Sequence, residues 1–344
     1  MNISTFGKYI DQPIILNKLD KKMPAILIGG GTLFAVADTY VQSKKHHNQN
    51  NKKRFFNNSI VIASTIAASL LGTRGLKING KKVINGLMER VPLKDLQAKQ
   101  TLAVEKFIDK SKIKDTQILN ALNTAKTKQL SMKEIELLTK ELPASDEKKA
   151  LFSVILPDKK NLNSKEIFSE IKRLSLLGLI PIIGGVAGGI AADKITNSKR
   201  KSSDKIKEGL YQYLANIFLC NVGAGTALYI AERLEKAKKI KPVTPLKKLV
   251  VIFAGISTTG IIGGSIAANY ISKKVIDPLF GNKNTHKGLY SERKPEALDI
   301  ALHTDDIATA GILSGFKWIE PSLPIMYFVS GYRAGIGYRN GKSK

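Results

Sequence analysis

The sequence predicts an all-α, polytopic membrane protein with about six spans, arranged as three Gly-rich hairpins, and a small helical domain outside the membrane. Two observations support this fold class. Five stretches of about 20 residues hold no charged side chain or only one, although 24% of the chain is charged, and this length crosses a hydrocarbon core of about 30 Å. Small residues also recur at every fourth position in several stretches, which is typical of helices that pack closely in lipid.

Charged residues define the ends of the five apolar stretches. Arg54 and Arg74 bound one stretch, and Arg173 and Asp193 bound another. A large soluble protein with helices that are apolar on all sides is the alternative, but such helices rarely run so long in so short a chain. We therefore predict five spans, at residues 23–41, 55–73, 174–192, 209–231 and 249–272.

A sixth apolar region, residues 307–332, is interrupted near its middle. Lys317 and Glu320 are charged, and Pro321 and Pro324 follow them closely. Each proline removes a backbone donor and disturbs the helix before it. The region is therefore predicted to form two half-segments of a broken last segment.

The polar region between the second and third spans, residues 76–173, has apolar residues at helical spacing. Ser131 followed by Glu134 is typical of a capping box at the start of a helix, and Pro143 is expected to end that helix. We predict a small, all-helical extramembrane domain here. The complete domain prediction is a tail at 1–22, hairpins at 23–75, 174–232 and 249–336, the polar domain at 76–173, a basic connector at 233–248 and a tail at 337–344.

The net charge of +27 comes from basic residues that gather beside the apolar stretches. Cations that flank spans bind anionic headgroups and set orientation. We therefore expect a lipid bilayer with anionic headgroups as the main partner, and a nucleic acid is not favoured because the polar region lacks an aromatic stacking surface. The composition, rich in Lys, Asn and Ile, is typical of an AT-rich genome, so the expected location is a bacterial inner membrane.

Two of the spans share a Gly-rich ending that suggests an internal repeat of the glycine-zipper kind. Small residues four apart form a groove along one helix face, into which a neighbouring backbone fits. We expect this groove to pack helices within one bundle, with a homo-oligomer interface as the alternative. The residues assigned to helix packing are Gly184, Gly188, Ala192, Gly260, Gly264 and Ala268.

Ionisable residues inside a membrane are candidates for function. Lys317 and Glu320 lie three apart, which places them on one helix face, and they precede two prolines as in the broken helices of transporters. Asp193 is a further candidate at the end of a span. The alternative is that all three residues mark the membrane interface, where water hydrates them.

No catalytic, metal or cofactor signature accompanies these residues. His46 and His47 are adjacent in a basic connector, and His286 and His303 are isolated, so none has ligand spacing. We expect no enzyme activity, metal or cofactor. The leading interpretation is a multi-pass membrane scaffold or interaction protein with a cytoplasmic protein partner; the alternative is a small transporter or channel with its site around Lys317 and Glu320.

Overall fold

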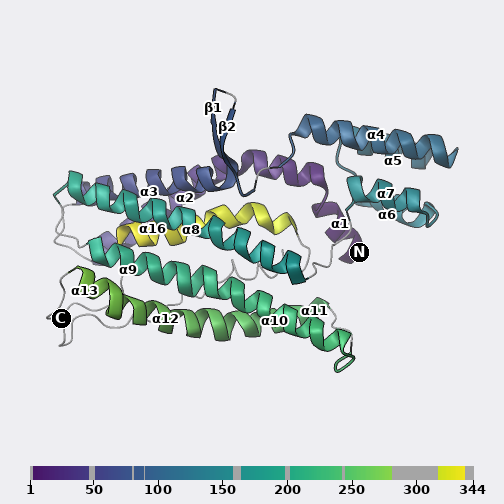
Figure 1. Ribbon diagram of the computed structural model, residues 1–344. Helices are drawn as coiled ribbons and strands as arrows, with labels where there is room; N and C mark the ends of the chain where they lie inside the picture. Colours follow the sequence, from purple (N-terminus) through teal and green to yellow (C-terminus); the bar gives the residue numbers. More distant parts are fainter. Residues whose placement is uncertain are drawn as a thin grey trace. The chain divides into compact units, whose positions relative to one another are not determined.

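The computed structural model is almost entirely helical (Figure 1). It describes residues 3–45, 51–79, 81–88, 90–157, 164–197, 202–241, 245–280 and 317–337. The chain divides into two compact units. Unit 1 comprises residues 1–23, 90–161 and 314–321, and unit 2 comprises residues 24–89, 162–313 and 322–344.

Unit 1 is a bundle of short helices with its own apolar core. Its elements are α1 (Ile3–Ile10), the start of α2 (Pro13–Lys45), α4 (Leu93–Ser111), α5 (Thr116–Thr127), α6 (Met132–Glu141), α7 (Asp146–Ile155) and most of the 3₁₀ helix η4 (Lys317–Ser322). Phe107, Leu122 and Leu138 are buried in one cluster. The capping box of Ser131 and Glu134 at the start of α6 is confirmed.

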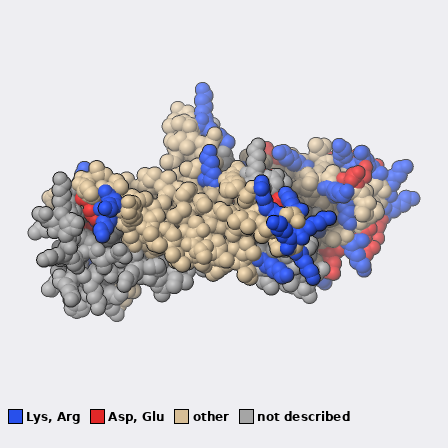
Figure 2. All heavy atoms as spheres, turned by 60° about the horizontal axis from the view of Figure 1, so that its bottom comes forward, with Lys and Arg blue, Asp and Glu red and all other residues tan. Residues whose placement is uncertain are grey.

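Unit 2 is a bundle of long helices. It contains the rest of α2, α3 (Asn51–Arg74), strands β1 (Gly75–Ile78) and β2 (Lys81–Asn85), α8 (Ser164–Ile195), α9 (Ser202–Tyr213), α10 (Leu219–Lys236), α11 (Pro245–Gly255), α12 (Gly264–Ile271), α13 (Asp277–Leu279) and α16 (Leu323–Ile336). Three π-helical segments join these helices, η1 (Leu214–Phe218), η2 (Ile256–Gly263) and η3 (Ser272–Ile276). Figure 2 shows a broad surface without charged side chains over this unit.

Within the described residues, five helices are long and apolar enough to cross a membrane, which gives the chain the fold of a helical membrane protein. They are Pro13–Val41, Lys52–Arg74, Glu166–Ile195, Ser202–Lys236 and Val250–Leu279, and each contains or overlaps one predicted span. The predicted sixth segment is different. Residues 307–316 lie outside the described residues, and α16 has 14 residues, which at 1.5 Å each is shorter than a hydrocarbon core of about 30 Å.

The helix α8 lies against both α3 and α16. It runs in the same direction as α16, because Gly185 faces Gly331 and Gly189 faces Gly335. It runs antiparallel to the helix formed by α9, η1 and α10, since Gly178 faces Ile217 and Gly225 faces Ile171.

The third predicted hairpin differs from the packing observed. The helices α11 and α12 run antiparallel to α9 and α10, since Gly255 faces Gly223 and Gly264 faces Ala215. They therefore point the same way as α8 and α16, whereas a hairpin joins antiparallel helices. The main neighbours of α16 are α3, α8 and α9.

The prediction of an all-helical region at 76–173 needs one correction. Residues 75–85 form a two-stranded antiparallel β-hairpin in place of helix. Residues 164–173 form the start of α8, and residues of the predicted tail at 1–22 form α1 and the start of α2.

Candidate functional site

The helix α9 buries charged side chains that its sequence would place at a surface. Lys205 and Lys207 are each 1% exposed and Glu208 is fully buried. Taken alone, the Lys- and Glu-rich segment is typical of a solvated connector. The helices α8, α16 and α12 and the segment η3 pack around α9 and bury these side chains.

Lys205 forms an ion pair with Asp193 near the C-terminal end of α8. Their Nζ and Oδ2 atoms are 2.6 Å apart. Gly189 makes room for this lysine, because a Cβ on Gly189 would lie 2.8 Å from Lys205 Cε. Burying a charge costs several kcal/mol of desolvation free energy unless a partner of opposite charge is close. The ion pair therefore stabilises both buried groups.

A ladder of side-chain hydrogen bonds follows along the same helix. The side-chain amide of Gln212 donates to Glu208 Oε1 over 2.8 Å, and the side-chain amide of Asn216 donates to Gln212 Oε1 over 2.9 Å. One turn further, Asn221 donates to the hydroxyl of Ser175 on α8 over 3.3 Å. Spacings of four residues place the first three side chains on one face of the helix.

We call this set the polar track. It consists of Lys205, Glu208, Gln212, Asn216 and Asn221 on the α9–η1–α10 helix, with Asp193 and Ser175 from α8. From its first to its last residue the track extends roughly 24 Å along the helix at 1.5 Å per residue, compared with a hydrocarbon core of about 30 Å. The π-helical segment η1 lies within it, and such segments are frequent at functional sites.

The register between α8 and α9 places Glu208 deep in the bundle. Its neighbour Gly209 faces Ile182 and Val186, which lie in the middle of the predicted span 174–192. The predicted span 209–231 begins directly after Glu208, so the sequence pattern alone places this charge outside the apolar stretch. The spacing of four that links Glu208, Gln212 and Asn216 was the signal that could have revealed the track.

Other polar side chains of unit 2 are paired or buried outside the polar track. Lys207 forms an ion pair with Asp277, and Arg333 of α16 is buried. The hydroxyl of Tyr332 donates to Asp38 Oδ2 over 3.3 Å and accepts from the amide of Asn58 over 3.2 Å.

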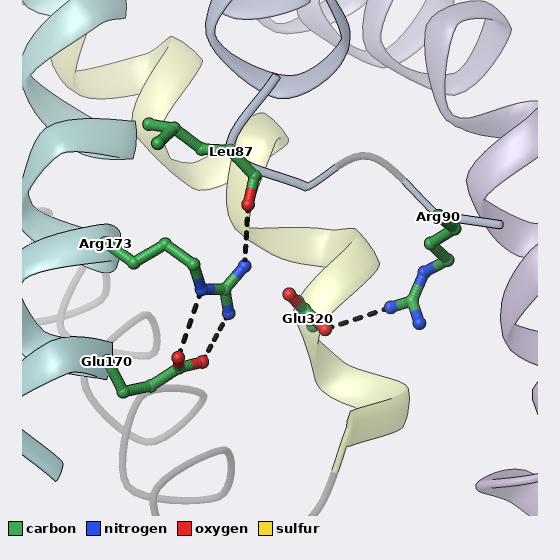
Figure 3. A network of polar contacts seen from close by, with 5 residues as sticks. All are labelled: Leu87, Arg90, Glu170, Arg173 and Glu320. Carbon is green, nitrogen blue, oxygen red and sulfur yellow. Dashed lines mark hydrogen bonds and ion pairs between the residues drawn. The ribbon is translucent and has the colours of Figure 1, made fainter. Parts of the chain in front are cut away.

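Lys317 and Glu320, the two candidates in the predicted broken segment, lie outside the polar track. Glu320 belongs to unit 1, where its Oε2 lies 2.9 Å from a guanidinium nitrogen of Arg90 (Figure 3). Lys317 begins η4, and its side chain lies outside the described residues. Of the three predicted candidates, Asp193 alone is in the polar track.

Figure 3 also shows a polar contact of unit 2. Arg173 on α8 binds the carboxylate of Glu170 one turn earlier, and its Nη1 donates to the backbone oxygen of Leu87 over 3.0 Å. The guanidinium therefore ties the segment after the β-hairpin to α8.

The four glycines assigned to helix packing face other helices of the same chain. Gly184 lies against Ala68, and Gly188 lies against Ser64, both of α3. Gly260 faces Cys220, and Gly264 faces Ala215 of the α9–η1–α10 helix. Ala192 and Ala268 are buried. The internal repeat itself stays a prediction.

The described part of the chain contains no group of three or more His, Cys, Asp or Glu side chains that could hold a metal ion. Comparison with known proteins finds no family model, no curated protein and no solved structure that matches this chain.

Proposed function

We propose that this chain is a multi-pass membrane protein that conducts protons or small cations through unit 2 along the polar track. The observation that supports the proposal is the full burial of Glu208 beside an apolar stretch of α8. A carboxylate at such a depth costs several kcal/mol unless other groups compensate it, and ionisable residues within membranes are usually functional.

The chemistry of the track fits a relay. The carboxylate of Glu208 can take up and release a proton, and the side-chain amides of Gln212 and Asn216 each offer a donor and an acceptor in line with it. The ion pair of Asp193 and Lys205 supplies charge at one end. Compared with the site expected from sequence, this proposal keeps Asp193 and replaces Lys317 and Glu320.

The test is flux in proteoliposomes that enclose a pH-sensitive dye. A K⁺ diffusion potential should drive proton uptake with the wild-type protein, and Glu208→Gln should reduce the rate to that of protein-free vesicles. Glu136→Gln, at an exposed position of α6, is the matched control and should keep the wild-type rate. Equal rates for wild type and Glu208→Gln, with H⁺, Na⁺ and K⁺ each tested, would reject the proposal.

A second candidate function is that of a membrane scaffold in a bacterial inner membrane, with unit 1 as the part that binds a cytoplasmic protein. The separate apolar core of unit 1 favours it, because a domain with its own core can present a fixed surface. Self-association would have to use helix faces other than those of the packing glycines, since these glycines contact helices of the same chain. They are Gly184, Gly188, Gly260 and Gly264. The mass of the detergent-solubilised protein by light scattering tests this part: a single copy contradicts a homo-oligomer.

A further inference from the structure

The β-hairpin of residues 75–85 continues directly from the C-terminal end of α3. Figure 1 shows it projecting across the direction of that helix. If α3 crosses a membrane, its end lies at the membrane surface, and a hairpin that runs across the helix direction extends along that surface.

The base of the β-hairpin is fixed to α3. The backbone N–H groups of Leu87 and Met88 donate to the carbonyl oxygens of Gly72 and Thr73 over 2.8 and 3.0 Å. These carbonyls belong to the last turn of α3, which has no partners within the helix. Gly75 adopts a φ of 72°, which favours glycine and turns the chain sharply out of the helix.

The two faces of the β-hairpin differ in character. Leu76 is paired with Ile84, and Ile78 lies two residues further on the same face, beyond a register shift between Leu76 and Lys77 and opposite Lys81 at the end of the hairpin. These three side chains are between 39% and 53% exposed. On the other face Lys77 is paired with Lys82. Figure 2 shows the projecting β-hairpin with uncharged atoms on one side and Lys and Arg on the other.

The apolar face is unfavourable in water, because apolar side chains that stay exposed gain nothing from folding. A two-stranded sheet is at best marginally stable by itself. An anionic leaflet suits both faces, because acyl chains accept the apolar face and phosphate groups attract the lysines of the other face.

We propose that the β-hairpin is a membrane-surface anchor that inserts Leu76, Ile78 and Ile84 at the boundary of the acyl chains and binds anionic headgroups through Lys77 and Lys82. The proposal rests on α3 crossing a membrane and is independent of conduction through the polar track. It concerns only the leaflet at the C-terminal end of α3.

The first test measures the depth of the β-hairpin. The full chain carries Cys220→Ala, a single new cysteine with an environment-sensitive fluorophore, and is reconstituted in vesicles that contain phosphatidylglycerol. We expect lipids spin-labelled near the top of the acyl chain to quench a label at Ile78→Cys several-fold more than one at Asn85→Cys, which is exposed on the opposite face. Equal quenching, or quenching of Ile78→Cys mainly by aqueous iodide, overturns the proposal.

The second test separates headgroup binding from simple burial. In vesicles with phosphatidylglycerol, Lys77→Gln with Lys82→Gln should lower the quenching of the Ile78→Cys label to the level seen in phosphatidylcholine alone. The matched control, Lys106→Gln with Lys110→Gln on α4, removes the same charge from exposed positions elsewhere and should change nothing. The headgroup assignment is wrong if quenching by the acyl spin label is the same in both lipids.

Before either test, a flotation experiment measures whether the protein moves with the lipid vesicles. A protein that does not float with lipid shows that unit 2 does not insert, which rejects the membrane fold itself. A protein that floats but keeps the β-hairpin in water rejects only the anchor. A label that is shielded from iodide and from spin-labelled lipid alike indicates contact with protein and also overturns the lipid anchor.

Discussion

Gly185 of α8 and Gly331 of α16 face each other so closely that a Cβ on Gly185 would overlap the carbonyl group of Gly331. The neighbouring row of α8 faces in another direction, with Gly184 against Ala68 of α3. The helix α8 therefore lies between two partners and uses a separate row of glycines for each. Lipid provides no hydrophobic drive between helices, so this close packing is the main source of cohesion in the bundle.

Enlarging Gly185 should separate α8 from α16. We expect Gly185→Leu to destabilise the bundle by about 1–3 kcal/mol or more, because the backbone of α16 cannot move aside as a flexible side chain can. Thermal unfolding of the detergent-solubilised protein measures the effect. Gly29→Ala is the matched control: a Cβ there meets nothing within 4 Å, and the change should be neutral or stabilise by about 0.4–1 kcal/mol. Equal effects would contradict the proposed role of the close contact.

The ion pair between Asp193 and Lys205 makes a second prediction. Asp193→Asn leaves the ammonium group without its carboxylate in a buried place and should cost about 3–5 kcal/mol. Adding Lys205→Met removes that charge and should recover most of the loss. The exposed pair of Asp146 and Lys149 serves for comparison, since breaking it should cost at most about 1 kcal/mol. If the double variant is no more stable than Asp193→Asn, the ion pair does not account for the stability of the buried Lys205 ammonium group.

The sequence predicted the apolar helices well because the free energy of inserting a helix depends mainly on its own side chains. It could not predict the depth of Glu208, since depth is set by the register at which Gly209 packs against Ile182 and Val186. No hydropathy window contains that information. The polar track was therefore missed, although Glu208, Gln212 and Asn216 recur at spacings of four.

The sequence contains a signal that could have predicted the β-hairpin. Asn79 is followed by Gly80 between two short runs rich in Ile, Val and Lys, and Asn-Gly is the strongest short-range signal for a hairpin turn. The structure places Asn79 at a φ of 49°, as such a turn requires. The helical spacing of apolar residues further along the polar region led to a helical prediction for all of it.

Gln12 connects the N-terminal helices of unit 1 to the segment between α5 and α6. Its Oε1 accepts from the N–H of Leu130 over 2.6 Å, and its Nε2 donates to the carbonyl oxygen of Leu130 over 2.9 Å. Gln12→Ala leaves both buried backbone groups without this partner, and each such group costs about 1–3 kcal/mol. We expect faster amide hydrogen exchange in α1 and in the segment around Leu130, while Gln117→Ala, at an exposed position, leaves exchange there unchanged. Unchanged exchange in Gln12→Ala would contradict this role.

The capping box of α6 should make the stability of unit 1 depend on pH. Burial pushes the pKa of Glu134 upward, but hydrogen bonds from the hydroxyl and N–H of Ser131 and from Thr124 outweigh it and hold the pKa below its usual 4.5. Because the pKa is lower in the folded state, the ionised carboxylate stabilises the fold above pH 4.5. That contribution is lost as the pH falls through the lowered value.

Hydrogen exchange of the α6 amides, corrected for the intrinsic rate at each pH, measures this dependence. In the wild type the opening free energy of α6 should fall as the pH drops below 4.5. In Glu134→Gln the side chain can still accept from the N–H of Ser131 but does not titrate, so the profile should be flatter and lower at neutral pH. Glu136→Gln, on the exposed face of the same helix, should keep the wild-type profile. A profile for Glu134→Gln as steep as that of the wild type would show that another group titrates in this range.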